Sequence, residues 1–411
     1  MSINQPTTIA ETRRIKLLLL TEPMGGGIRR YIHDVVYGLD PNLFDITLVY
    51  GASRTDKSFQ DNLQQMCEHA TLIPCNELVR EVSLQHDWRA IRAVIRIMRQ
   101  VQPDIVHCNS SKAGVIGRVA AKLQGIPAIY SSHGWAMQNI DFGRRKKQIF
   151  AGIEAVLSRF ATATTINVSP TEKQCALDWH INSSNQFIVI SNGVDPSTML
   201  SREESRARLG LSDNAIVVGT AIRLTAQKDP LQIIDIFARA HQQNPALHLA
   251  ILGDGELRDA VKQAINENGI EQAVTCYGYR ADASQLMAAF DVVMMTSTAE
   301  GLPYTLLEAE AVGVPIVATN VEGIRDIVKP GVTGELFPFG DVEQGANALL
   351  SVLDATSALA SVNEAGEGDM DAINMPYSRQ AIYHDFMQRF SLNLMIKELT
   401  SVYQRFAKTS K

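Results

Sequence analysis

Residues 292–319 read VVMMTSTAEGLPYTLLEAEAVGVPIVAT, in which two short apolar runs enclose a stretch with helical character. The runs at residues 292–296 and 315–318 are almost continuously hydrophobic, which is typical of parallel strands buried on both faces. Pro303 is well placed as the first residue of a helix over residues 303–312, because that position needs no amide hydrogen bond. A strand, a helix and a second strand in this order predict a right-handed βαβ unit.

The same alternation continues along both halves of the chain, with a polar, highly charged stretch between them at residues 195–213. This stretch lacks strand character, and SREESRARLG (201–210) in it reads as a short surface helix leading out of a linker. Strict alternation of strand and helix predicts doubly wound α/β domains. We therefore expect two Rossmann-like domains that face each other across a ligand-binding cleft, with the boundary near residue 195.

The other expected elements follow from hydrophobic period and turn residues. Strands are expected at residues 15–21, 46–50, 105–108, 128–131, 163–168 and 187–190 in the first half and at 216–222, 247–252 and 274–277 in the second. Helices are expected at residues 28–39, 84–101, 111–124, 230–241 and 256–268, and two more, at 377–390 and 392–406, follow an exposed acidic loop at 364–371.

Length and composition are those of a globular protein whose 411 residues exceed what one core organises. The net charge of −6 argues against nucleic acid as a partner. No apolar run reaches the roughly 18–20 residues that span a bilayer, and the polar start MSINQPTTIAETRR does not read as a secretory leader. Scattered cysteines without a CxxC pair indicate reduced, mostly buried thiols in a cytoplasmic protein without a zinc site: Cys67, Cys75, Cys108, Cys175 and Cys276.

Two glutamates flank the start of the helix expected after the 292–296 run: Glu300 in the preceding loop and Glu308 on the second turn. Backbone amides and the positive dipole end of a helix start bind anions, so we expect Tyr304, Thr305 and Leu306 to offer a phosphate site. Carboxylates accept strong hydrogen bonds from hydroxyls, so the pair suits a sugar and a ribose. Two surface acids favoured by the helix dipole alone are the alternative.

The loop AIRLTAQKD (221–229) also follows an expected strand and carries two cations, Arg223 and Lys228. Two cations at the carboxyl end of a strand suit a diphosphate. They would also stabilise the charge that develops on a departing nucleotide diphosphate. Loop cations that are merely solvated are the alternative.

Other loops after expected strands carry weaker signals. The glycines of MGGGIRR (24–30) allow a close backbone approach to a ligand. The GxGxxG pattern is incomplete there, and YGA (50–52) lacks the acidic residue that binds a ribose, which argues against a nicotinamide dinucleotide. GDG (253–255), NGVD (192–195) and His133 lie in further loops, where turn geometry or a structural histidine is the alternative.

Together these motifs resemble the GT-B glycosyltransferases of the large retaining family 4 (glycosyl transferases group 1), of the bacterial polysaccharide type. The resemblance covers nearly the whole chain. It rests on GGG (25–27), QPDIVH (102–107), HG (133–134), NGVD (192–195), Arg223 with Lys228, GDG (253–255) and the E-x7-E spacing of Glu300 and Glu308.

The resemblance implies an acceptor-side domain over residues 1–195, completed by a C-terminal helix at about 391–411, and a nucleotide-sugar-binding domain over residues 196–390. It implies a catalytic set in which Glu300 contacts the donor sugar, Arg223 and Lys228 hold the diphosphate, and His133 lies near the reacting centre. Glu308 would bind the ribose and Tyr279 would lie beside the nucleobase, with Gly26 and Gly27 closing over the donor. The further donor-binding positions would be Asn192, Gly253, Gly301, Leu302, Pro303, Tyr304 and Thr305.

The implied reaction needs no metal and no cofactor, because arginine, lysine and helix amides take the metal's place and the nucleotide sugar is a substrate. The family transfers with retention, yet no carboxylate is an obvious nucleophile. We therefore favour front-face transfer, in which the leaving phosphate helps to deprotonate the acceptor, over a covalent intermediate. UDP is the favoured nucleotide because it is frequent in the family.

Two basic stretches bear on the acceptor. Arg89, Arg92, Arg96 and Arg99 lie on one helical face, and Arg144, Arg145, Lys146 and Lys147 follow Trp135, Met137, Ile140 and Phe142. Basic residues beside exposed aromatics dock on anionic lipid, whereas a solvated helix face is the alternative. We expect residues 144–147 to bind the inner membrane peripherally and the acceptor to be a lipid-linked saccharide for a surface polysaccharide.

Two rival functions stay open. A sugar-nucleotide epimerase of the same fold would convert the free sugar nucleotide without an acceptor. A non-catalytic nucleotide-sugar-binding partner would keep the fold and lose turnover, although the intact Glu300, Glu308, Arg223 and Lys228 speak against it.

Overall fold

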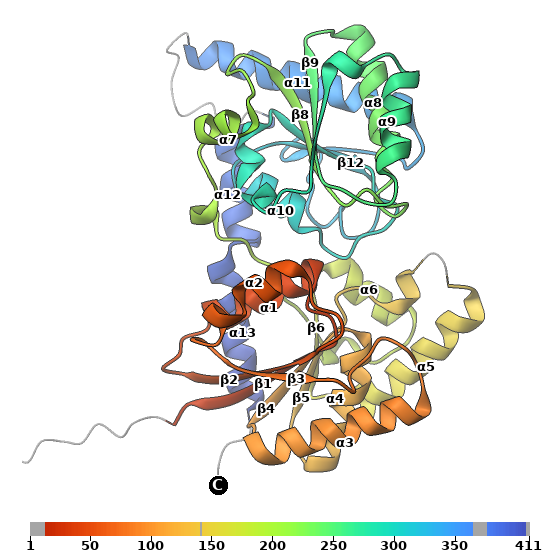
Figure 1. The fold of residues 1–411 in the computed structure, drawn as a ribbon, viewed down its shortest axis with the longest axis vertical. Coiled ribbons are helices and arrows are strands. Elements are labelled where there is room, and N and C mark those ends of the chain that lie inside the picture. The colour runs from red at the N-terminus through yellow and green to blue at the C-terminus, as the bar shows by residue number, and fades with distance from the viewer. Residues whose placement is uncertain (1–12, 140–141, 365–375, 408–411) are drawn as a thin grey trace, which may run out of the picture. The chain divides into compact units, whose positions relative to one another are not determined.

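The computed structural model describes residues 13–139, 142–364 and 376–407 and contains two parallel sheets, each with helices on both faces (Figure 1). The expected α/β class is confirmed. The first sheet has the order β3-β2-β1-β4-β5-β6-β7. Its strands are β1 (Ile15–Thr21), β2 (Phe44–Gly51), β3 (Thr71–Cys75), β4 (Ile105–Asn109), β5 (Ala128–Ser131), β6 (Thr164–Asn167) and β7 (Phe187–Val189).

The second sheet has the order β10-β9-β8-β11-β12-β13, and its strand pairs are parallel. Its strands are β8 (Ile216–Ala221), β9 (Leu247–Leu252), β10 (Val274–Gly278), β11 (Val292–Met295), β12 (Ile316–Thr319) and β13 (Gly334–Phe337). In both sheets the strand order reverses once, between β1 and β4 and between β8 and β11. Loops that leave such a switch point at the carboxyl ends of the strands diverge and leave room for a ligand.

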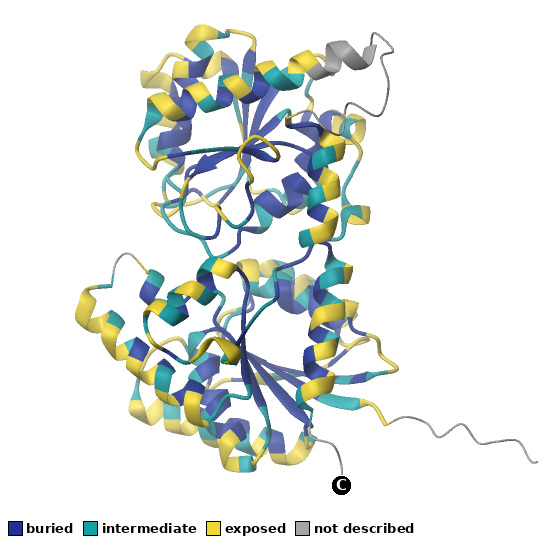
Figure 2. Cartoon of the chain, turned by 180° about the vertical axis from the view of Figure 1, so that it is seen from behind, coloured by how far each residue is buried: buried dark blue, intermediate teal, exposed yellow. Residues whose placement is uncertain are grey.

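The helices of the first half are α1 (Gly26–Gly38), α2 (Lys57–Met66), α3 (Leu84–Val101), α4 (Ser111–Gln124), α5 (Arg144–Phe160) and α6 (Pro170–Asp178). Those of the second half are α7 (Arg202–Leu209), α8 (Pro230–Gln243), α9 (Arg258–Glu267), α10 (Tyr304–Glu310), α11 (Val342–Glu364), α12 (Arg379–Arg389) and α13 (Leu392–Phe406). Figure 2 shows buried residues along the strands and exposed residues on the outer faces of the helices. In the described part of the chain, no helix has the length and apolarity that crossing a membrane requires.

Contacts divide the chain into two compact units, Met1–Ser132 with Glu154–Ile166 and Glu398–Lys411, and His133–Ile153 with Asn167–Lys397. The sheets change between β7 and β8, near residue 195. In the first unit, Tyr403 of α13 hydrogen-bonds through its hydroxyl to Nδ1 of His107 (2.8 Å), and both side chains are buried. The last helix is thereby joined to the centre of the first sheet.

Two short strands, β3 and β13, were not expected from the sequence, and their positions in the sheets explain why. β3 and β13 are edge strands, and β3 is only partly buried and contains Pro74. Edge strands need no continuous apolar run and tolerate proline, so the hydrophobic pattern is weak there. Helices α2, α5, α6 and α11 were also missed. The expected acidic loop lies outside the described residues, except for Glu364, which ends α11. The first twelve residues and the end of the expected C-terminal helix also lie outside the described residues.

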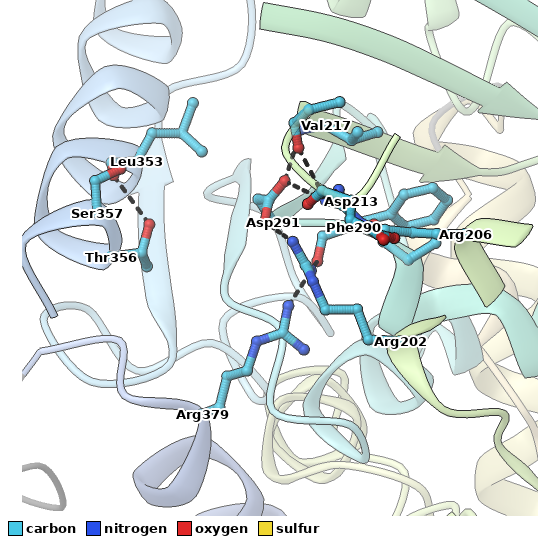
Figure 3. Close-up of polar contacts among 12 residues, drawn as sticks. Arg202, Arg206, Asp213, Val217, Phe290, Asp291, Leu353, Thr356, Ser357 and Arg379 are labelled. Carbon is cyan, nitrogen blue, oxygen red and sulfur yellow. Dashed lines mark hydrogen bonds and ion pairs between the residues drawn. The ribbon is translucent and has the colours of Figure 1, made fainter. Parts of the chain in front are cut away.

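Helix α7 lies at the surface as expected, with Glu203, Glu204, Ala207 and Arg208 exposed, but its inner face buries a charged residue, which the sequence did not indicate. Arg206 on it is fully buried, and its guanidinium donates to the carboxylate of Asp291 (2.9 Å; Figure 3) and to the carbonyl of Ala289 (3.0 Å). Arg379 at the start of α12 donates to the neighbouring carbonyl of Phe290 (2.8 Å). Arginine can be buried when its donors are paired in this way, which a polar/apolar reading of the sequence misses.

Candidate functional site

The loops after β8 and β11 leave the switch point of the second sheet and are held together by hydrogen bonds. The hydroxyl of Thr296 donates to the carbonyl of Asp229 (2.7 Å), and the amide of Thr298 donates to the carbonyl of Gln227 (2.9 Å). The Gln227 side chain donates in turn to the carbonyl of Ala299 (2.8 Å). The two loops that carry the expected cations and the expected glutamate therefore form one structural unit.

Lys228 and Glu300 meet between these loops as an ion pair, Nζ to Oε1. The side chains are 14% and 9% exposed, so each charge depends on the other for compensation. The structure thus brings together two members of the expected catalytic set. The sequence placed them in one pocket but did not predict that they would bind each other.

Arg223 lies at the start of the loop after β8, and its side chain is exposed. Among the described residues, no ion pair engages its guanidinium. The backbone around it is fixed, because the amide of Leu224 donates to the carbonyl of Asp254 (3.0 Å) and the hydroxyl of Thr305 donates to the carbonyl of Ala221 (2.9 Å). Within the described residues, the Arg223 guanidinium therefore has no carboxylate counterion and projects from a fixed backbone, an arrangement that suits anion binding.

The start of α10 differs from the expectation in two details. The helix begins at Tyr304, and Pro303 is the capping residue with an extended ψ of 122°, not the first helical residue. Its carbonyl accepts from the amide of Leu306 (3.2 Å), so this amide is not available to a phosphate as expected. Glu308 is buried on α10, 7% exposed, whereas Glu300 precedes the helix as expected.

Asn192, Gly301, Leu302 and His133 gather beside this helix start. The side chain of Asn192 donates to the carbonyl of Leu302 (3.3 Å), and within the described residues its own Oδ1 is buried without a hydrogen-bond partner. A Cβ on Gly301 would lie 3.9 Å from the His133 carbonyl oxygen. The expected histidine loop therefore lies against the loop that carries Glu300.

His133, two residues after the end of β5, has a φ of 53°, in the left-handed region. Desolvation lowers its pKa from 6.5 to about 4, so the ring is neutral near pH 7. Glu172 holds the turn: its carboxylate accepts from the amides of Gly134 and Val168, each at 2.6 Å. Glu172 is not among the residues expected at the site. Its signal was the capping pattern SPTE (169–172), in which the Ser169 hydroxyl accepts from the Glu172 amide (3.1 Å).

Gly253 and Tyr279 lie at the ends of β9 and β10. Gly253 has a φ of 148°, and a Cβ there would lie 1.8 Å from the carbonyl oxygen of Ile222. Only glycine therefore fits at this position, where the loops after β8 and β9 begin. Tyr279 is 71% exposed, and its ring is accessible to a planar ligand.

The remaining expected positions lie elsewhere. Gly26 and Gly27 begin α1 in the first unit, where the Gly26 amide donates to Asp56 Oδ2 (3.3 Å). Residues 144–147 form the first turn of α5. Two of the apolar side chains expected to be exposed beside them are buried, because Trp135 and Met137 are each 3% exposed. Phe142 is half-buried, and the ammonium group of Lys146 lies 3.5 Å from the centre of its ring, so one aromatic does lie beside the basic residues. The indole of Trp135 donates to the carbonyl of Glu172 (3.0 Å), which explains its burial, and Ile140 lies outside the described residues.

The family model Glycosyl transferases group 1 matches residues 201–369, and Glycosyltransferase Family 4 matches residues 25–198. The UDP-Gal:alpha-D-GlcNAc-diphosphoundecaprenol alpha-1,3-galactosyltransferase of Escherichia coli is 28% identical over 81% of this chain and 86% of its own. The capsular polysaccharide biosynthesis glycosyltransferase CapM of Staphylococcus aureus is 22% identical over 84% and 87%. Anabaena Alr3699/HepE in complex with UDP has the same fold, with a TM-score of 0.75 and 23% identity over 95% of this chain and 100% of that chain.

Proposed function

This chain belongs to the group 1, family 4 glycosyltransferases of GT-B fold, and we propose that it moves a sugar from a UDP-sugar to a lipid-linked saccharide during surface polysaccharide synthesis. The observation that carries the proposal is the Lys228–Glu300 pair at the switch point, beside the exposed Arg223. The E. coli relative, whose name gives a UDP-sugar and a diphosphoundecaprenol acceptor, supports the choice of substrates.

The donor would be bound by exchange of partners. A diphosphate beside Arg223 replaces Glu300 as the counterion of Lys228, because phosphate carries more charge than one carboxylate. Glu300 is then released to accept hydrogen bonds from the donor sugar's hydroxyls. Glu308 binds the ribose and Tyr279 lies against the nucleobase. The other loop positions of the second unit surround the sugar and the diphosphate: Asn192, Gly253, Gly301, Leu302, Pro303, Tyr304 and Thr305.

The transfer would proceed with retention and without a metal or cofactor. Arg223 and Lys228 stabilise the charge that develops on the leaving diphosphate. The leaving phosphate takes the acceptor's proton on the same face of the sugar. His133, neutral and fixed by its turn, lies beside the donor sugar and can donate or accept a hydrogen bond there without adding charge.

Incubation with a panel of UDP-, GDP- and ADP-sugars tests the proposal, with slow donor hydrolysis as the readout. We expect nucleotide release from a UDP-sugar that falls about 100-fold or more in Glu300→Ala, a loss of the size seen when an electrostatic contact to the transition state is removed. Glu256→Ala, at an exposed position, is the matched control. Isomerised sugar nucleotide would instead identify an epimerase, and binding without any turnover would identify a non-catalytic partner.

The acceptor's lipid suggests how α5 is used. Ile149, Ile153, Val156 and Phe160 recur along one helical stripe and are exposed, by 64% in Ile149 and Phe160. The basic residues 144–147 precede this stripe on the same helix. A basic, apolar-striped helix lies in the interface of an anionic membrane, and peripheral binding at the inner leaflet is therefore part of the proposal.

Liposome flotation tests this surface. Replacing residues 144–147 by serine should abolish binding to vesicles that contain anionic lipid, and Ile149→Ser with Phe160→Ser should weaken it. The matched control replaces Arg89, Arg92, Arg96 and Arg99 by serine, which removes the same charge from α3. Equal loss in both charge variants, or none in the first, would contradict docking through α5.

A further inference from the structure

A cavity of about 470 Å³ opens beside the loop that carries Glu300 and is distinct from the residues to which donor binding is assigned above. Thr298 and Ala299, directly before Glu300, form one wall, and the loop after β12 and helix α6 form others. All its lining residues belong to the second compact unit. Its volume is within the range of small-molecule sites.

The loop after β12 is fixed against the Glu300 backbone. Gly323 has a φ of 78°, and a Cβ there would lie 2.5 Å from the carbonyl oxygen of Glu300. Only glycine allows this approach, which places the preceding Glu322 in the cavity wall. A ligand in the cavity would therefore contact the loop that carries Glu300, the residue to which binding of the donor sugar is assigned above.

The polar groups in the cavity wall include both hydrogen-bond donors and acceptors, and some of them are held in place by hydrogen bonds to each other. Gln138 donates from its side-chain nitrogen to Glu322 Oε2 (2.8 Å), and its oxygen accepts from the amide of Trp135 (2.9 Å). This chain of bonds orients Glu322, whose other oxygen can accept a further bond. Arg325 and Asn320 are exposed at the same wall, and among the described residues no ion pair engages Arg325.

The cavity has no charge excess. Lys147 and Arg325 are balanced by Asp178 and Glu322, and the thiol of Cys175 is protonated because burial raises its pKa to about 12. A balanced wall does not favour a nucleotide or another polyanion. It offers both donors and acceptors at short intervals, which suits a neutral ligand with several hydroxyl groups.

Apolar walls complete the site. Trp179 at the end of α6 and Met137 line the cavity with a half-buried indole and a thioether. An indole face packs on the C–H face of a sugar ring while amide and guanidinium groups bind the hydroxyls at its rim. The geometry points to a second sugar subsite, which binds a neutral pyranose of the acceptor saccharide. This inference rests on the proposed transfer.

Ligand-observed NMR with methyl glycosides of glucose, galactose, mannose and N-acetylglucosamine, each added to the full chain with UDP, tests the subsite. We expect at least one glycoside to bind, and Trp179→Ala and Arg325→Ala to weaken it about tenfold, as the loss of one good hydrogen bond or ring contact implies. Trp88→Ala and Arg239→Ala, which change exposed residues outside the cavity, are the matched controls. Arg325 is exposed, so its variant keeps the test valid if Trp179→Ala unfolds.

The outcomes separate this inference from the proposed function. Glycoside binding that is weakened about tenfold in both cavity variants, while their affinity for UDP is unchanged, supports the subsite. No glycoside binding, or binding that neither variant alters, overturns the subsite while leaving UDP binding to test the donor site. Displacement of the glycoside by a UDP-sugar but not by UDP would assign the cavity to the donor's own sugar and overturn the acceptor assignment.

Discussion

Lys228 and Glu300 lie on loops from two different strands and neutralise each other across the switch point of the second sheet. Each side chain is largely buried, so neither charge can be released at low cost without a replacement. In the proposed reaction, the diphosphate and the sugar of one donor molecule would supply both replacements at once. The pair would then couple recognition of the phosphate to recognition of the sugar.

Breaking this pair should destabilise the chain in a non-additive way. Lys228→Met or Glu300→Gln alone leaves a buried polar partner uncompensated and should lower the free energy of unfolding by about 1–3 kcal/mol. The double variant should cost less than the sum, because it removes both charges. Urea unfolding of the four proteins measures the coupling. Strictly additive costs would show that the two side chains do not depend on each other.

The neutral state of His133 should make stability depend on pH. Its pKa falls from 6.5 to about 4 on folding, so the unfolded chain takes up the proton first as the pH decreases. This stabilisation is fully present above pH 6.5 and is lost as the pH falls toward 4, by at most about 3 kcal/mol. His133→Asn, which tolerates the left-handed φ, should lose less stability over this range. Parallel pH profiles of the urea midpoint would contradict the assignment.

Gly253→Ala should be among the most damaging single changes. The new Cβ would overlap the carbonyl oxygen of Ile222 at 1.8 Å, and the φ of 148° is strained for any other residue. We expect a loss of about 3 kcal/mol or more, since backbone must move. Gly152→Ala, in α5 with open space around it, is the control and should stabilise by about 0.5–1 kcal/mol. Thermal unfolding of both variants measures the contrast.

Glu172→Gln should loosen the His133 turn. A glutamine cannot accept from both the Gly134 and the Val168 amide, so one donor is left facing an NH₂ group, at a cost of about 1–3 kcal/mol. Glu256→Gln, at an exposed site, should change stability little. Donor hydrolysis should fall in Glu172→Gln at a temperature where the variant remains folded. Full activity there would mean that the turn does not position His133 for the reaction.

Local pattern was enough for much of the fold. The buried strands β1, β5 and β9 and the helices α3, α4 and α13 have the expected bounds, because continuous apolar runs and helical stripes depend only on the residues themselves. The edge strands β3 and β13 and the buried arginine of α7 were missed, since their stability depends on neighbours that the sequence does not show. The start of α10 was expected one residue too early, at Pro303, because proline is accepted both at the capping position and at the first helical position.

The candidate site likewise has features that the local sequence predicts and features that only tertiary packing decides. Residue types and their spacing predicted that Arg223, Lys228, Glu300 and Glu308 bind the donor, because anion and hydroxyl binding use those groups after a strand and at a helix start. The ion pair, the Glu172 clamp, the burial of Trp135 and the cavity beside Gln138 arise from contacts between residues far apart in the chain. Only the packing of one element on another brings such groups within hydrogen-bonding distance, and packing is a property of the folded chain.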